Sequence, residues 1–178
     1  NMRYFFTVVI FFYSCSNDPQ LLTEFIAEEH LPIEQMENVE ILHTEKGILQ
    51  IKIIANNINR FENTTPKLVF SDGFKVIFYN DSGLVNSVLK AVNAEVNEDD
   101  NIMIVSDNVV LTSSEGKKIE TEKLVWDKNR NKIYTNRKVV ITTKKEVIKG
   151  EGFESNLDFS EYFISKIHGT FNFEPQTD

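Results

Sequence analysis

The chain has 178 residues, a formal net charge of −8 and a single cysteine. This length suits one domain around one core, with some residues left over for an export signal or a tether. The acidic balance and the lack of a Lys/Arg-rich run argue against a surface that binds nucleic acid through its phosphates. With one cysteine, the domain has no internal disulfide and must be held together by its core alone.

Residues 1–14 are predicted to form a signal peptide. Arg3 is followed by an apolar run over residues 7–13 and then by small residues. This run is about half of the roughly 20 residues that a membrane-spanning helix needs. Cys15 stands where a bacterial lipoprotein carries its modified cysteine, so we expect it to be the lipid attachment site. The alternative is a chance cysteine inside an ordinary signal.

Residues 15–35 are predicted to combine the lipid anchor, a tether and a short docking segment. Residues 16–20 are polar and rich in turn-forming residues. Residues 21–30 could form a short helix with its apolar side chains on one side, which Pro32 would end.

Residues 36–178 are predicted to form a β domain. Apolar and polar residues alternate in several runs, and each run is followed by a turn signal. Residues 74–79 precede a turn at 80–83, residues 109–111 precede one at 113–116, and residues 139–141 precede one at 143–145. Antiparallel strands joined by hairpin turns are the direct interpretation.

A loose internal repeat runs through this β domain at intervals of about 30 residues. Each copy has an apolar residue, a small residue two positions later and an apolar residue three positions after that. The step of three moves the following side chains to the other face of a strand unless a β-bulge absorbs it, so the repeat predicts bulges and a curled sheet. Chance periodicity in a valine-rich protein is the alternative. The copies are Ile53/Ala55/Ile58, Leu89/Ala91/Ala94, Ile119/Thr121/Leu124 and Ile148/Gly150/Phe153.

The sequence shows no motif for catalysis, metal binding or a cofactor. Glu28-Glu29-His30 lacks the second histidine of a zinc-binding helix. His43 and His168 are isolated, and Gly116 is not part of a phosphate-binding loop. We therefore expect no enzyme activity, no cofactor and no metal.

The residues from 108 to 153 resemble the LptC family, a periplasmic component of the lipopolysaccharide export machinery that shares its fold with LptA. The likeness covers roughly residues 36–173 and is clearest from 109 to 168. It lies in the order of strands over 108–111, 118–127, 133–141 and 148–153. Its clearest single positions are Leu124, Trp126, Ile148, Gly150 and Phe153.

The resemblance implies an all-β fold, a twisted, V-shaped open β-jellyroll of stacked antiparallel hairpins, as in LptA and related OstA-like proteins. It also implies an apolar groove that takes the acyl chains of lipopolysaccharide. The cargo would come from an inner-membrane ABC transporter and pass to an LptA-like bridge protein, with the neighbours added edge to edge. Family members usually begin with a transmembrane helix, whereas this chain would use Cys15. The expected location is periplasmic, anchored by lipid to a membrane, with the inner membrane preferred.

Two sets of candidate site residues follow from the repeat and the resemblance. Ordinary core packing is the alternative for each groove residue, and a simple turn is the alternative for the two glycines. Residues 165–173 are predicted to form the last strand, ended by Pro175, and to face a partner. The groove candidates are Ile53, Phe78, Leu89, Val109, Leu111, Ile119, Leu124, Trp126, Ile141 and Phe153. The partner-edge candidates are Gly150, Gly152, Lys166, Ile167 and Phe171.

Other functions remain compatible with the sequence. A lipoprotein β-sandwich that acts as an adhesin or scaffold, with no lipid cargo, would show the same strands but a fully packed core. An enzyme with a dispersed site would show converging polar groups in a cleft. LptA itself is the nearest rival within the superfamily, and it would lack a lipid at Cys15.

Overall fold

The computed structural model describes residues 31–62, 64–157 and 161–168. The predicted signal peptide, Cys15, the possible helix at 21–30 and Phe171 lie outside these residues. The chain divides into two units, 1–31 and 32–178, and every described strand belongs to the second. Within the described residues, no helix is long and apolar enough to cross a membrane.

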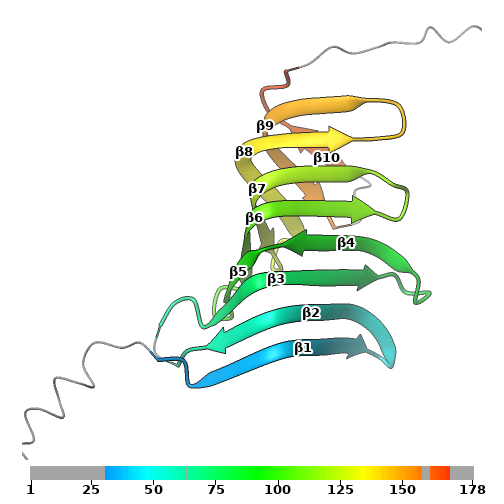
Figure 1. Cartoon of the computed structure of the whole chain (residues 1–178). Helices are drawn as coiled ribbons and strands as arrows, with labels where there is room; N and C mark the ends of the chain where they lie inside the picture. Colours follow the sequence, from blue (N-terminus) through cyan, green and yellow to red (C-terminus); the bar gives the residue numbers. More distant parts are fainter. Residues whose placement is uncertain (1–30, 63, 158–160, 169–178) are drawn as a thin grey trace, which may run out of the picture. The chain divides into compact units, whose positions relative to one another are not determined.

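The second unit is built from one antiparallel sheet in which hairpin follows hairpin (Figure 1). The strands pair in the order β1-β2-β3-β4-β6-β7-β8-β9-β10, and β5 pairs with β3 and β6. The predicted all-β fold of stacked antiparallel hairpins is therefore confirmed. The bounds are β1 Glu34–Glu45, β2 Ile48–Arg60, β3 Leu68–Tyr79, β4 Val85–Ala91, β5 Asn93–Asn97, β6 Ile102–Ser113, β7 Lys118–Asp127, β8 Lys132–Thr142, β9 Val147–Asn156 and β10 Tyr162–Ile164.

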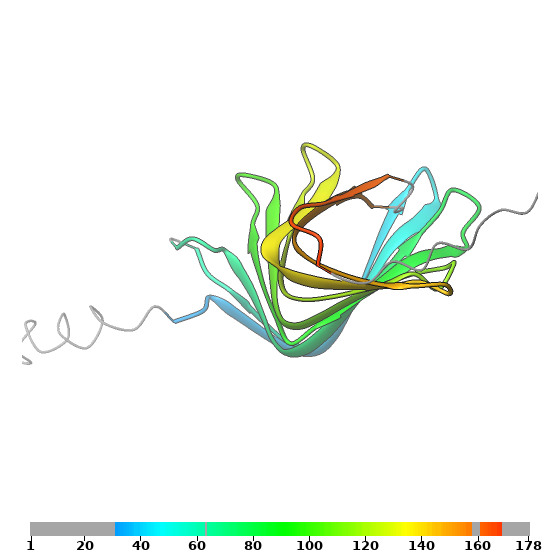
Figure 2. The same cartoon turned by 90° about the horizontal axis from the view of Figure 1, so that it is seen from above.

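A line of bulges folds this sheet into a V, which Figure 2 shows from above. The register shifts at Ala55/Asn57 in β2 and at Thr121/Val125 in β7, and a break at Val92 separates β4 from β5. These are the places where the sequence repeat steps by three residues, so the predicted bulges are confirmed there. We call the side of the V that contains β4 the β4 arm and the side that contains β5 the β5 arm.

The returning strands bend by a different device. In β3 the bend falls at Asp72 and Gly73, and in β6 it falls at Asp107 and Asn108. All four residues have positive φ values between 54° and 104°, a conformation that Gly, Asn and Asp adopt more readily than other residues. The side chain of each aspartate also accepts a hydrogen bond that fixes the bend. Asn57 Nδ2 donates to Asp72 Oδ2 at 2.6 Å, and Asn93 Nδ2 donates to Asp107 Oδ2 at 2.8 Å.

Two rows of apolar side chains line the inside of the V. In the β4 arm, directly paired residues form a continuous row across every strand from β1 to β9 except β5, and we call this the β4-arm row. A shorter row of paired residues crosses the β5 arm from β1 to β7, and we call it the β5-arm row. The β4-arm row is Ile41, Ile53, Val76, Leu89, Leu111, Ile119, Ile141 and Ile148. The β5-arm row is Met36, Ile58, Phe70, Ala94, Val105 and Leu124.

Candidate functional site

The inner faces of the two arms meet in the middle of the sheet. Phe78 in the β4 arm and Trp126 in the β5 arm pack edge to face, with ring centroids 5.4 Å apart and planes at 83°. The space left between the arms here is a cavity of about 10 Å³, close to the volume that one water molecule needs. In this structure the middle of the V is therefore filled by side chains. The cavity is lined by Phe78, Ser87, Leu89, Val105, Leu111, Leu124, Trp126, Ile133 and Leu157.

The ten groove candidates fall into three groups on this inner face. Five of them line the central cavity: Phe78, Leu89, Leu111, Leu124 and Trp126. Four more are buried elsewhere in the same core: Val109, Ile119, Ile141 and Phe153. Ile53 is partly buried and packs against that core near β1.

The inner face is open where the sheet begins. Ile41, the β4-arm row residue on β1, is 39% exposed, whereas Val76 in the same row is 1% exposed. Met36, Val39 and Ile51 are also only partly buried. Among the described strands β1 pairs with β2 alone, so its outer edge carries unpaired backbone groups. This end combines accessible apolar side chains with a free strand edge.

The other end of the sheet is covered by the chain itself. β10 pairs with β9 from Phe153 to Ser155. Beyond β10, Ser165 N donates to the Gly152 carbonyl at 2.9 Å, and His168 N donates to the Lys149 carbonyl at 2.7 Å. The last described strand is Tyr162–Ile164, so the strand predicted at 165–173 is wrong for residues 165–167, which follow β10.

Gly150 and Gly152 lie beneath this covering segment. A Cβ added at Gly150 would overlap Ile164 Cγ2 and would lie 3.1 Å from the Ser165 carbonyl oxygen. A Cβ at Gly152 would lie 3.1 Å from Ser165 Cβ. Of the other partner-edge candidates, Lys166 pairs with Glu151 at 3.3 Å and Ile167 is exposed.

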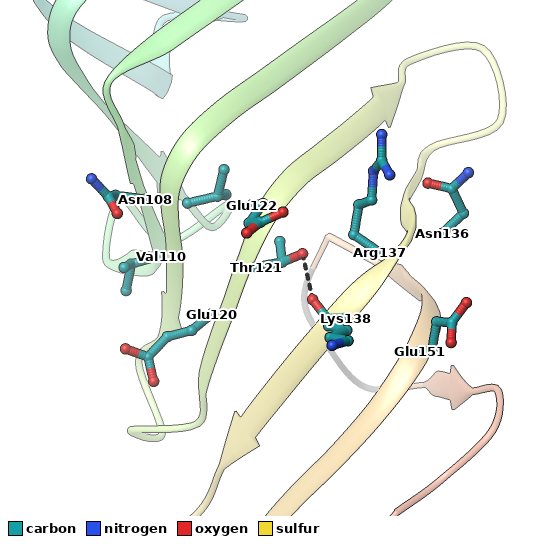
Figure 3. A pocket seen from close by; sticks show the side chains of 10 residues that line it. Asn108, Val110, Glu120, Thr121, Glu122, Asn136, Arg137, Lys138 and Glu151 are labelled. Atoms are coloured by element: carbon teal, nitrogen blue, oxygen red, sulfur yellow. Dashed lines mark hydrogen bonds between the residues drawn. The ribbon is translucent and has the colours of Figure 1, made fainter.

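A second cavity, of about 590 Å³, lies at the bend of β6 to β9 (Figure 3). It occurs where the pairing of β7 with β8 is interrupted between Thr121 and Val125. Thr121 Oγ1 donates to the Lys138 carbonyl at 2.9 Å on its wall. Both acidic and basic side chains line it, which gives a surface of mixed charge: Glu120, Glu122, Arg137, Lys138 and Glu151. Within the described residues, no group of three or more His, Cys, Asp or Glu side chains is placed to hold a metal ion.

Sequence reasoning missed Ser87, Val105, Ile133 and Leu157 among the residues that line the central cavity. The signal for Ser87 is its place two residues before Leu89 and four before Ala91, which puts the three side chains on one face of a strand. A search for apolar alternation does not find it, because serine is polar.

Comparison with known protein families gives one match. The family model described as "Lipopolysaccharide-assembly, LptC-related" matches residues 4–170, nearly the whole chain. A comparison of the chain with curated proteins finds no match. The family implies a part in lipopolysaccharide export within the cell envelope, as a transport component and not as a known class of enzyme. The chain therefore belongs to the LptC-related family of lipopolysaccharide-assembly proteins.

Proposed function

We propose that the chain receives lipopolysaccharide from the inner-membrane ABC transporter and passes it to an LptA-like bridge protein through the space between its two arms. The observation that supports this most directly is the β4-arm row, which continues from Ile41 on β1 to Ile148 on β9. A lipid that moves along this row stays in contact with apolar side chains across the sheet.

The free energy of such a path is favourable. Each methylene that leaves water gains about 0.8 kcal/mol, so several acyl chains in contact with the inner face can offset the loss of membrane contacts. Neighbouring strands are about 4.8 Å apart, so successive residues of the row present nearly continuous apolar surface. Lipid could therefore cross an aqueous compartment without exposing its acyl chains.

Lipid can occupy the middle of the V only if the arms separate. At the bend the pairing of β2 with β3, of β6 with β7 and of β7 with β8 is interrupted by bulges. Side-chain packing such as the Phe78–Trp126 contact holds the inner faces together. We therefore expect opening about the bend to leave most strand pairing in place, and the acyl chains to replace the apolar contacts that are lost.

The two ends of the sheet are where we place the neighbouring proteins. Strand addition to an open edge supplies backbone hydrogen bonds without a large side-chain patch. The outer edge of β1 suits this directly. At the opposite end, the neighbour meets β10 and the partner-edge candidates Lys166, Ile167 and Phe171, and it reaches the candidates Gly150 and Gly152 on β9 only by displacing the covering segment.

We place the protein in the periplasm, held by a lipid at Cys15, with the inner membrane as the preferred location. Incorporation of labelled palmitate in cells tests the anchor. The wild-type chain should be labelled and Cys15→Ala should not. Equal labelling of the two would remove Cys15 as the attachment site.

Site-specific photo-crosslinking in cells tests the transport path. A photoreactive residue at Leu89, whose side chain faces the interior, should capture lipopolysaccharide. The matched control is Lys90, the next residue of β4, which is exposed. Capture at Leu89 should require ATP hydrolysis by the transporter. Equal capture at Leu89 and Lys90 would contradict a path through the interior.

A second candidate function is a binding module with no lipid cargo, such as an adhesin or scaffold. The observation in its favour is the close packing at the centre, where only about 10 Å³ remains between the arms. If this function is correct, purified protein carries no lipid and Leu89 captures none. Co-purified lipopolysaccharide would exclude it.

A further inference from the structure

Three buried side-chain polar atoms have no hydrogen-bond partner in the described part of the chain. One is Asn59 Oδ1, which does not line the central cavity. The other two face the interior: Ser87 Oγ, in a residue that is 1% exposed, and Trp126 Nε1, in a residue that is 9% exposed. Both residues line the central cavity. Ser87 belongs to the β4 arm and Trp126 to the β5 arm, so the cavity has one such group on each wall.

The other buried polar side chains of the described core do have partners. Ser113, which pairs with Ser87 across β4 and β6, accepts a hydrogen bond from Lys117 N at 3.2 Å. Ser155 Oγ donates to the Glu161 carbonyl at 2.9 Å, and Asp127 Oδ1 accepts from Arg130 N at 3.0 Å. Because buried polar groups are almost always paired, the two exceptions in one cavity call for a ligand that pairs with them.

The position of the two groups along the strands indicates which part of a lipid they meet. Ser87 lies one inward-facing residue farther from the bend than Leu89, and Trp126 lies one farther than Leu124. The polar groups are therefore nearer the mouth of the V, and the purely apolar rows are deeper. An acyl chain that inserts with its methyl end toward the bend would bring its carbonyl to the level of Ser87 and Trp126.

We propose that Ser87 and Trp126 form a subsite for the ester or amide carbonyl at the head of an acyl chain. The Ser87 hydroxyl and the Trp126 indole N–H are both hydrogen-bond donors, and a carbonyl oxygen has two lone pairs to accept them. The subsite sets how deeply the chain inserts, while the rows below it bind the hydrocarbon. This inference rests on the proposed function, because it needs lipid between the arms.

Trp126 is an intrinsic spectroscopic probe of this subsite, because it is the only tryptophan in the sequence. Ultraviolet resonance Raman spectroscopy resolves whether an indole N–H is hydrogen-bonded. We would add purified lipopolysaccharide, and separately hexadecane, to the full chain in mild detergent. Lipopolysaccharide should move the indole N–H band to its hydrogen-bonded position. Hexadecane, which has no oxygen, should leave the band where it is.

Matched serine variants complete the test. Ser87→Ala should weaken lipopolysaccharide binding by about fivefold, the effect of one neutral hydrogen bond, and should leave hexadecane binding unchanged. Ser113→Ala, on the neighbouring strand, should leave lipopolysaccharide binding unchanged. If lipopolysaccharide binds but the band does not move, or if the two variants bind equally well, the subsite is overturned and the transport path stands. If the wild-type chain binds no lipopolysaccharide, the proposed function fails and the subsite fails with it.

Discussion

The two ends of the sheet differ in how far their apolar side chains and their strand edges are exposed. At the β1 end, Ile41 is partly open to solvent and the strand edge has no partner among the described residues. At the β9 end, Ile148 is buried and the chain's own residues 162–168 cover the edge. The same apolar row thus passes from an accessible end to a covered one.

If neighbouring proteins dock by strand addition as proposed, the two ends offer them unequal docking sites. A neighbour can add a strand to β1 without moving anything that the structure describes. A neighbour that pairs directly with β9 must displace the covering segment or extend from β10. The free-energy cost of docking is therefore expected at the β9 end.

The same substitution at a partly exposed and at a buried position of the β4-arm row should have unequal effects. Ile141→Ala removes a side chain that is 0% exposed, and it should lower the free energy of unfolding by about 2–5 kcal/mol because it leaves a cavity. Ile41→Ala should cost less than about 1 kcal/mol, because Ile41 is partly solvated already. Urea unfolding of both variants measures the difference. Equal losses would mean that the β1 end is as tightly packed as the middle.

Gly150→Ala should loosen the covered end. The new Cβ would overlap Ile164 and crowd the Ser165 carbonyl, so we expect a loss of about 1–3 kcal/mol and faster hydrogen exchange at the His168 amide. Adding Ile164→Ala removes the overlapping methyl group, and the double variant should lose less than the sum of the single variants. Strict additivity would show that Gly150 and Ile164 do not interact.

The bend should depend on residues that accept a positive φ. Asn108, with a φ of 54°, should tolerate glycine, whereas Asn108→Val should lower the free energy of unfolding by about 1–2 kcal/mol. The comparison of the two variants in urea separates backbone strain from the loss of the side chain. A valine variant as stable as the glycine variant would show that the bend does not rely on this conformation.

The smallest effect is expected for the ion pair between Lys67 and Asp99, whose Nζ and Oδ1 are 2.8 Å apart. The hydrogen bond that Lys67 Nζ donates to Asp99 Oδ1, followed by the negative charge of Asp99, raises the pKa of Lys67 above the ordinary value of 10.5. The stabilisation that this ion pair provides is therefore fully present below pH 10.5, and it is lost as the pH rises through the raised pKa of Lys67. Lys67→Gln should be slightly less stable than wild type at neutral pH and equal to it above that pKa. A stability difference that persists at high pH would contradict this assignment.

Much of the fold could be predicted because its signals are local. Alternating residues and turn signals indicated the hairpins, and the step from Ala55 to Ile58 indicated a bulge. The returning strands gave no such signal, because the interval from Phe70 to Phe74 or from Val105 to Val109 is even and looks like ordinary alternation. Their bends depend instead on Asp72-Gly73 and Asp107-Asn108, which read as turn residues only when the strand around them is known.

The candidate site was harder to predict, because it depends on how closely the two arms approach each other. The alternation identifies Leu111 and Trp126 as interior residues but does not say whether their side chains meet across the V. Likewise, the sequence does not show that Gly150 leaves room for Ile164, since that contact depends on where the chain turns after β9. The spacing of Ser87 from Leu89 indicates which face of the strand it occupies, but the lack of a hydrogen-bond partner for its hydroxyl depends on the folded neighbours.

The number of hairpins sets the length of the sheet, whereas the bend within each hairpin sets the angle of the V. Each hairpin carries its own bulge or its own pair of positive-φ residues, so the fold line does not depend on any single strand. A duplicated hairpin such as residues 118–142 would extend the molecule by roughly 10 Å, two strand spacings, without changing the angle of the V. The length of the sheet can therefore change without a change in the width of the V.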